Sequence, residues 1–474
     1  MTKMKVVYTI GIFITLLALL VIVFLFVRQN PVVVLTNEGF VPDTVQIKKG
    51  TTITFKTSDT EPFWPASNVH PSHTGYPDFD PKKPLAPSET WSFTFTEAGT
   101  YSFHDHLRPL FTGAIVVTDG SSSSARKDEC NENTTQCLEQ KVRDLARNKG
   151  AVEALDYLKI KYKTDAAVSD SCHGYTHSIG QESYSRYAVD GIVEVTPFAD
   201  YCGFGFYHGF MEAMLHTTGD VSGAKEFCGR VKKTLSESSP SAVSACLHGI
   251  GHGVIDGSDR TTWGSPQKMI ERGLMFCEDI GENYYDKKIC GTGVFNSLAI
   301  LYADKKHNLL VDTKNPYQIC TEQEKDYFNE ACHEDMNTLV WSISNRDFAT
   351  AVLYLQNIQT DPYVQTALRS LALIPGSVAH KESFLPDAKV CQSLPPGLQL
   401  SCIEGYAVGI TESGSAETRY HTSFDFCDVD VLSIANKKAC YKNVTDFLQR
   451  ISSKEVYMQA CEVAKKRFTT VCGI

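Results

Sequence analysis

Two spacings of apolar residues divide the chain. Between residues 31 and 119, β-branched and aromatic residues form short runs separated by polar turns, and about 90 residues of such runs indicate a β-sandwich. Beyond residue 130, apolar side chains recur at helical spacing, so we expect this part to be mostly helical. The predicted strands are Val32–Thr36, Val45–Lys49, Thr52–Thr57, Thr90–Thr96, Thr100–His106 and Ala114–Thr118. The clearest helical segments are Leu138–Tyr162, Ala349–Leu355, Tyr363–Leu373 and Ala460–Phe468.

An uncharged apolar segment, residues 6–27, precedes the predicted strands. As a helix it would be about 33 Å long, enough to cross a hydrocarbon layer of about 30 Å. Lys3 and Lys5 lie before it, which favours a cytoplasmic N-terminus at residues 1–5. No small-residue cleavage site follows it before Arg28, so we expect an uncleaved transmembrane signal anchor and a single-pass protein whose bulk is extracytoplasmic.

Cysteine usage agrees with an oxidising compartment. The chain has 16 cysteines, all between Cys130 and Cys472, and no two are spaced as C-x-x-C. This distribution favours disulfide bonds over a metal-binding cysteine cluster. The net charge is -10 and there is no long basic run, so nucleic acid is not expected as a partner.

A polar, serine-rich linker at residues 120–129 marks the change from no cysteines to many. The predicted fold class is therefore multidomain. It comprises one transmembrane helix, a β-sandwich at residues 31–119, and an all-α, disulfide-stapled helical-hairpin repeat domain at residues 130–474.

The helical half contains an internal repeat, with the frame C-x-x-G-x-x-[H/N/V]-[G/S] opening an apolar helix. Copies begin at Cys202, Cys246, Cys290 and Cys402, and Cys172 begins a looser one. Units of roughly 35–50 residues are typical of a solenoid or toroid of helix pairs.

A second class of cysteines precedes these positions by one helix, so each disulfide is expected to tie one helix of a hairpin to the next. The predicted pairs are Cys228–Cys246, Cys277–Cys290, Cys320–Cys332, Cys391–Cys402, Cys427–Cys440 and Cys461–Cys472. The other four cysteines, which are Cys130, Cys137, Cys172 and Cys202, allow three connectivities between which the sequence does not choose.

Histidines and one glutamate recur four residues apart in three consecutive units of this repeat. If the hairpins stack in register, these pairs converge on a histidine-rich metal or catalytic centre, or they are buried packing residues of the repeat. The candidates are His173, His177, His208, Glu212, His248 and His252. Asn296 and Val408 occupy the repeat position of His208, which favours the packing interpretation.

The β half resembles a cupredoxin domain. Asn37–Phe55 is similar to its opening strands, and Gly99–Val117 to its closing strand, ligand loop and last strand. Asp105, Arg108 and Phe111 stand where the blue-copper Cys, His and Met are expected, and the domain has no cysteine. Because a blue-copper site needs a thiolate, the resemblance does not extend to plastocyanin-type electron transfer.

Two histidine pairs in this domain are similar to the H-P-x-H and H-x-H copper segments of multicopper oxidases. They predict a mononuclear copper site, with zinc as the alternative, at His70, His73, His104 and His106. Asp105 is expected to orient a ligand histidine, and Arg108 to turn away or bind an anion. The alternative is that the histidines cap loops or pack on Trp64.

The sequence thus predicts a membrane-anchored, extracytoplasmic metal-binding protein whose copper could carry redox activity. Its helical repeat domain is expected to carry a second histidine-rich site or a surface for a protein partner. One alternative is an envelope adaptor that keeps the sandwich as scaffold and binds peptide or glycan through its helices. Another is a metal-dependent enzyme centred on the helical histidines. Substrate, redox partner and oligomeric state remain open at this level.

Overall fold

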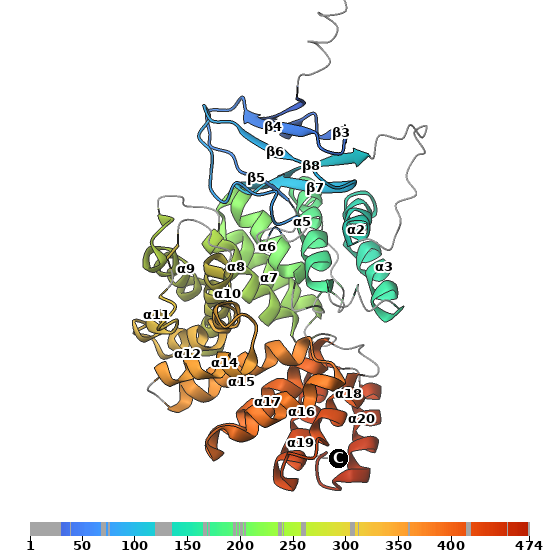
Figure 1. The fold of residues 1–474 in the computed structure, drawn as a ribbon, viewed down its shortest axis with the longest axis vertical. Coiled ribbons are helices and arrows are strands. Elements are labelled where there is room, and N and C mark those ends of the chain that lie inside the picture. The colour runs from blue at the N-terminus through green and yellow to red at the C-terminus, as the bar shows by residue number, and fades with distance from the viewer. Residues whose placement is uncertain are drawn as a thin grey trace, which may run out of the picture.

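The chain folds into a β-sandwich joined to a large helical domain (Figure 1). The computed structural model describes residues 30–37, 39–67, 73, 76–118, 135–164, 168, 171–192, 196, 199, 202, 205–235, 239, 241–256, 262–303, 309–310, 312–358, 361–413, 419–452 and 454–472. The predicted anchor at 6–27, the linker at 120–129, His70 and Cys130 lie outside these residues. None of the helices in the described ranges is long and apolar enough to cross a membrane.

The sandwich consists of two four-stranded sheets, with strand orders β2-β1-β4-β6 and β3-β8-β7-β5. Apolar residues alternate along the strands and meet between the sheets, where aromatic rings such as Phe55, Phe79 and Phe103 fill the core. The strands are β1 Val32–Thr36, β2 Gly39–Val41, β3 Thr44–Lys48, β4 Thr52–Thr57, β5 Pro65–Ser67, β6 Trp91–Thr94, β7 Gly99–Asp105 and β8 Arg108–Thr118.

The helical domain begins with α2 in the described part of the chain. The segment predicted as Leu138–Tyr162 is two helices, because Gly150 between them has a φ of 112° that ends the first. The helices of the first half are α2 Thr135–Lys149, α3 Ala151–Thr164, α5 Cys172–Asp190, α6 Gly205–Thr218, α7 Val221–Leu235, α8 Ala242–Asp256, α9 Pro266–Ile280 and α10 Tyr284–Ala303.

The second half continues the same arrangement with shorter elements. Residues 349–355, predicted as one helix, are divided between a short α-helix and a 3₁₀ helix. The elements are α11 Gln318–Thr321, α12 Asp326–Asp335, α13 Asn337–Ile343, α14 Phe348–Ala351, η3 Val352–Asn357, α15 Asp361–Ser377, α16 Lys381–Ser393, α17 Pro396–Ser413, α18 Arg419–Cys427, α19 Ile434–Ile451 and α20 Lys454–Arg467.

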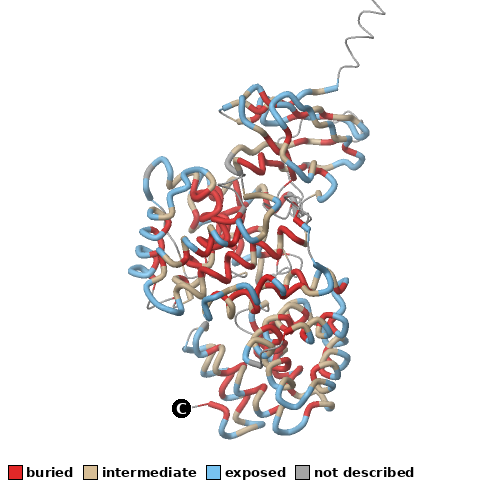
Figure 2. The backbone as a smooth tube through the Cα atoms, turned by 90° about the vertical axis from the view of Figure 1, so that its left-hand side faces the viewer, coloured by how far each residue is buried: buried red, intermediate tan, exposed pale blue. Residues whose placement is uncertain are grey.

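Buried backbone follows the inner helices, as the tube in Figure 2 shows. Helices α5, α6, α8 and α10 pack side by side in chain order. The repeat glycines permit this contact: a Cβ on Gly209 would lie 2.0 Å from the carbonyl oxygen of His177, and one on Gly293 would lie 1.9 Å from that of His248. Because only glycine fits there, the helices are held with these repeat positions at the same level.

The structure contains disulfides at all six predicted pairs. It also bonds Cys172 to Cys202, and Cys137 is disulfide-bonded. One expectation about their role was wrong: Cys461–Cys472 ties α20 to the turn that follows it, because no helix follows α20 in the described chain. The seven disulfides whose two cysteines both lie in the described residues are consistent with an extracytoplasmic or secreted location.

The sandwich rests on the helices through β7 and β8, which contact α2, α5 and α6. The Ser102 hydroxyl donates to the side-chain oxygen of Gln140 at 3.0 Å, and the rings of Trp64 and Trp263 lie 6.3 Å apart. A cavity of about 580 Å³ remains between the two domains, lined by residues of both. The end of the sandwich that carries the histidines therefore faces the helical domain.

Candidate metal centre

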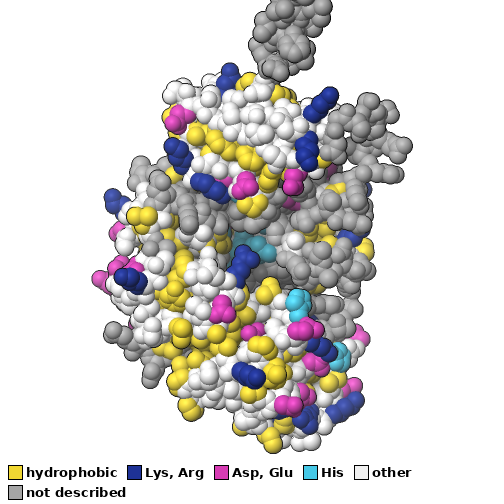
Figure 3. Space-filling model, in the orientation of Figure 1, with side chains coloured by type: hydrophobic (Ala, Val, Ile, Leu, Met, Phe, Trp, Pro, Cys, Tyr) yellow, Lys and Arg dark blue, Asp and Glu magenta, His cyan; other side chains and the backbone are white. Residues whose placement is uncertain are grey.

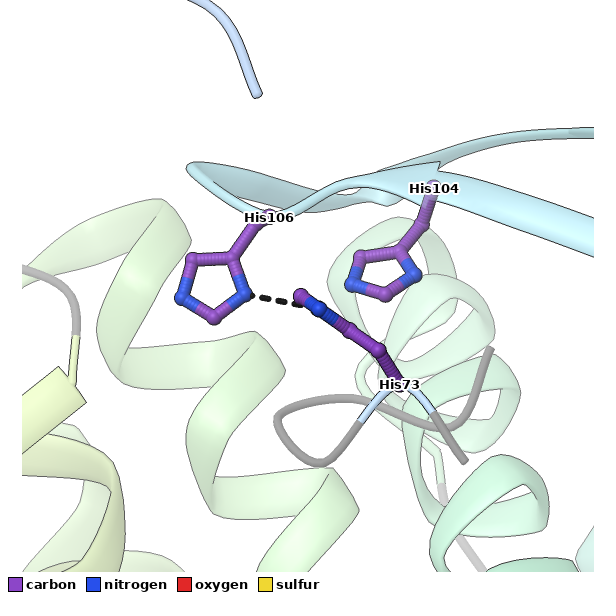
Figure 4. A group of neighbouring side chains, drawn as sticks. All are labelled: His73, His104 and His106. Carbon is purple, nitrogen blue, oxygen red and sulfur yellow. Dashed lines mark hydrogen bonds between the residues drawn. The ribbon is translucent and has the colours of Figure 1, made fainter. Parts of the chain in front are cut away.

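Three of the four predicted sandwich ligands meet at one buried point. His104 lies near the end of β7, His106 follows the strand, and His73 belongs to the loop between β5 and β6. Their exposed fractions are 0–1%, and one ligand nitrogen from each lies within 4.8 Å of the others. Figure 4 shows His104 and His106 projecting from the same side of the chain, with His73 between them.

Local backbone features set these directions. A register irregularity between β7 and β8 falls at His104 and Asp105, and such bulges re-aim side chains at strand ends. The His106 amide then donates to the carbonyl oxygen of Trp64, 2.7 Å away. The indole of Trp64 covers the imidazole of His106, with ring centres 4.2 Å apart, so that one wall of the site excludes water.

The spacing of the nitrogens suits one bound ion. His106 Nδ1 and His73 Nε2 lie 3.0 Å apart. Two imidazole nitrogens bound at about 2.0 Å to a tetrahedral ion lie about 3.3 Å from each other. The donor set is entirely imidazole, which copper and zinc both accept.

Asp80 orients His73, a role that the sequence analysis assigned to Asp105. The His73 Nδ1–H donates to Asp80 Oδ2 at 2.5 Å, which leaves Nε2 as the ligand atom. Asp80 Oδ1 accepts from the Trp64 indole at 2.8 Å and from the Lys82 amide at 2.7 Å. The sequence signal for Asp80 was an Asp-Pro turn, which does not indicate a partner for a distant histidine.

The positions of the blue-copper ligands hold an ion-pair network instead. Asp105 accepts hydrogen bonds from the Trp64 amide and from Arg108 Nε, both at 2.7 Å. Arg108 also pairs with Asp59 at 2.9 Å and lies 5.4 Å from the ring centre of Phe111. Burial raises the pKa of Asp105, and Arg108 opposes that rise. Arg108 thus turns away from the histidines, as the sequence analysis allowed.

The six candidates of the helical domain also come together, where α5, α6 and α8 pack against one another. Glu212 lies between two histidines, with Oε2 2.9 Å from His177 Nε2 and Oε1 2.7 Å from His252 Nδ1. His208 stacks between the rings of His248 at 4.9 Å and His252 at 4.6 Å. Figure 3 shows a histidine surface in a recess below the sandwich.

The surroundings of this cluster lower the pKa of two of its histidines and of its carboxylate. Burial lowers the pKa of His248 to about 3 and that of His208 well below its usual value, and neighbouring histidines add to both effects. Burial alone would raise the pKa of Glu212, but its contacts with His177 and His252 hold that pKa well below the usual range.

Comparison with known proteins identifies the sandwich. Residues 13–117 match the family model described as a cupredoxin-like domain, so the sandwich within this range is a cupredoxin-like domain. Among solved structures, it is similar to a reduced amicyanin mutant at 26% identity, covering 19% of this chain and 81% of that one with a TM-score of 0.17.

Two further solved structures cover the same 19% of the chain. Amicyanin from Paracoccus versutus is 20% identical over 83% of its length, and a purple cupredoxin from Nitrosopumilus maritimus is 19% identical over 99%, each with a TM-score of 0.16. No curated protein matches the chain.

Proposed function

We propose that this chain is a membrane-anchored, extracytoplasmic copper-binding protein whose sandwich holds the ion through His73, His104 and His106. His70, which lies outside the described residues, is the candidate fourth ligand. The observation that carries this proposal is the convergence of three buried imidazoles, one of them oriented by the buried carboxylate Asp80.

Copper is favoured over zinc by two arguments. The sandwich is a cupredoxin-like domain, and divalent copper binds a given nitrogen site more tightly than divalent zinc does. Bound copper would supply one-electron redox chemistry at this point of the sandwich. Because the domain has neither cysteine nor methionine, the bound ion would lack the thiolate that gives blue-copper proteins their colour.

The residues around the ligands have separate tasks. Asp80 fixes the proton of His73 on Nδ1, and Trp64 shields His106 from water. Asp105 and Arg108 hold the strand end that carries the other two ligands, through the Trp64 amide and the ion pair to Asp59. The chain's own residues thus preorganise the imidazoles before any ion arrives.

The test is metal content of the purified full-length chain by mass spectrometry, after removal of metal and dialysis against Cu(II). His104→Ala should lose one equivalent of copper relative to the unchanged chain. The exposed His380 provides a matched control, and His380→Ala should keep full content. Equal copper content in the His104 and His380 variants would refute the proposal and favour the envelope adaptor.

Membrane anchoring by residues 6–27 is a separate part of the proposal, supported by their length and lack of charge. The full chain should sediment with membranes and be released by detergent but not by high salt. A chain that begins at residue 30 should stay in the supernatant. Release of the full chain by salt alone would contradict the anchor.

A further inference from the structure

The histidine cluster of the helical domain has two layers, one helical turn apart. The outer layer holds His173 of α5, His208 of α6 and His248 of α8. The inner layer holds the residues four positions later in each helix, which are His177, Glu212 and His252. Because α5, α6 and α8 pack side by side, with Gly209 against His177 and Gly249 against Tyr207, the histidines of the three helices lie at similar levels and each layer places α6 in the middle.

Neighbouring ring centres in the outer layer are spaced like those of ligands that share one ion, although the ligand nitrogens of the three rings do not all lie within 4.8 Å of one another, as those of the sandwich site do. The ring centres of His173 and His208 lie 5.1 Å apart, and those of His208 and His248 lie 4.9 Å apart. Two imidazoles on a tetrahedral ion have centres about 5 Å apart. In the sandwich site, the two shorter distances between ring centres are also 5.1 and 4.9 Å.

The two flanking rings of the outer layer, those of His173 and His248, each make a hydrogen bond through Nδ1. His173 Nδ1 donates to the carbonyl oxygen of Cys202 at 2.9 Å. His248 Nδ1 lies 2.8 Å from the hydroxyl of Thr292, and that hydroxyl donates to the carbonyl oxygen of Ile289. Each imidazole therefore carries its proton on Nδ1 and keeps Nε2 as a lone pair, which is the arrangement that metal-ligating histidines adopt.

The central imidazole has a nitrogen with no hydrogen-bond partner among the residues that the structure describes. His208 is 4% exposed, and its buried Nε2 makes no hydrogen bond within the described structure. The same holds for Nε2 of His252, whose ring stacks on that of His208 at 4.6 Å and 14°. Buried polar atoms in folded proteins are almost always satisfied, so these nitrogens indicate a ligand.

A structural histidine in this domain looks different. His333 follows the repeat cysteine Cys332 as His173 follows Cys172, yet its ring lies between those of Tyr317 and Tyr363, at 5.6 and 4.8 Å. Its Nδ1 donates to the carbonyl oxygen of Asn329. The rings of the cluster instead face one another, which packing alone does not require.

We propose that α5, α6 and α8 form a second transition-metal site, separate from the sandwich, in which His173, His208 and His248 bind copper or zinc. The inner layer positions these ligands, and Glu212 places one negative charge beneath the ion. His173 and His248 retain solvent-accessible surface, which gives the ion a path of entry and allows their rings to rotate onto it. The open face of the ion would take water or a small ligand.

The experiment measures metal bound by the full-length chain after chelation and dialysis against Cu(II), and separately against Zn(II). The unchanged chain should bind two equivalents, and the double variant His208→Asn with His248→Asn should bind one. Asn296 occupies the repeat position of His208 in a later unit, so we expect asparagine to fit at position 208. His333→Asn is the matched control and should bind two.

The experiment distinguishes failure of the second site from failure of the sandwich site. If the cluster variant loses one equivalent while His104→Ala loses none, the second site stands and the sandwich site is refuted. If the unchanged chain binds one equivalent that only His104→Ala removes, the second site is refuted. Should the double variant fail to show the circular dichroism of the unchanged chain, the single variant His173→Gln decides, because its side chain reaches solvent. Its affinity at the second site should fall at least tenfold, and unchanged affinity would overturn the proposal.

Discussion

Asp80→Asn changes the candidate copper site without touching a ligand. The carboxylate accepts the Nδ1 proton of His73 at 2.5 Å and, through its other oxygen, hydrogen bonds from the Trp64 indole and the Lys82 amide. An asparagine keeps one oxygen for those last two donors and turns an NH₂ toward His73. Since two donors cannot pair, the His73 proton moves to Nε2, which is the atom that faces His106.

Moving the His73 proton from Nδ1 to Nε2 is expected to lower the affinity of the site for copper. Loss of a carboxylate that orients a ligand histidine lowers metal affinity about 10- to 100-fold, or about 1.4–2.7 kcal/mol. Competition titration of Cu(II) against a chelator of known affinity measures it, with the exposed neighbour Asp78→Asn as control. An affinity for Asp80→Asn within threefold of the control, in a variant with unchanged circular dichroism, would refute the role assigned to Asp80.

Three other outcomes follow from single residues. Gly293→Ala should lower the melting temperature, because its Cβ would lie 1.9 Å from a backbone oxygen of α8. The control Gly229→Ala has open space around the new Cβ and should raise the melting temperature slightly. Equal shifts of the two variants in a thermal scan would contradict the tight helix contact. Burial lowers the pKa of His333, so its contribution to stability is present above pH 6.5 and is lost as the pH falls toward its lower folded-state pKa. The unchanged chain should therefore lose more stability than His333→Gln between pH 7.5 and pH 5 in denaturant titrations, and parallel losses would exclude the effect. Cu(II) should quench the fluorescence of Trp64, because the ring centre of Trp64 lies 4.2 Å from that of His106. Trp64→Phe should therefore remove most of the quenching. Unaltered quenching in this variant would place the ion elsewhere.

Local patterns in the sequence were sufficient for the elements and for the disulfides. Strand alternation gave β1 and β4 with their observed bounds, and the spacing of cysteines around each hairpin gave six bonded pairs. Both signals are short-range: a strand's period is two residues, and the paired cysteines lie 11–18 residues apart. The rule that each disulfide joins the two helices of one hairpin did not predict Cys172–Cys202, because its separation of 30 residues exceeds one hairpin.

The candidate ligands were visible in the sequence because histidine pairs two or four residues apart share one side of a strand or helix. Their surroundings were not visible. Asp80 reaches His73 across a loop, Trp64 covers His106 from the position just before β5, and Arg108 is turned away by Asp59, 49 residues earlier. Such partners depend on how loops close over the sandwich, and no periodicity records this.

The sequence by itself determined which residue types occur at which spacing, and hence the strands, the hairpins and the two groups of histidines. Only the tertiary structure decided which of those histidines face one another. In the helical domain that decision rests on Gly209 and Gly293, where the absence of a Cβ lets neighbouring helices touch and sets their repeat positions level. In the sandwich it rests on one buried carboxylate, since a hydrogen bond across the loop selects Nε2 of His73, the nitrogen that faces His106, as the one that can bind an ion.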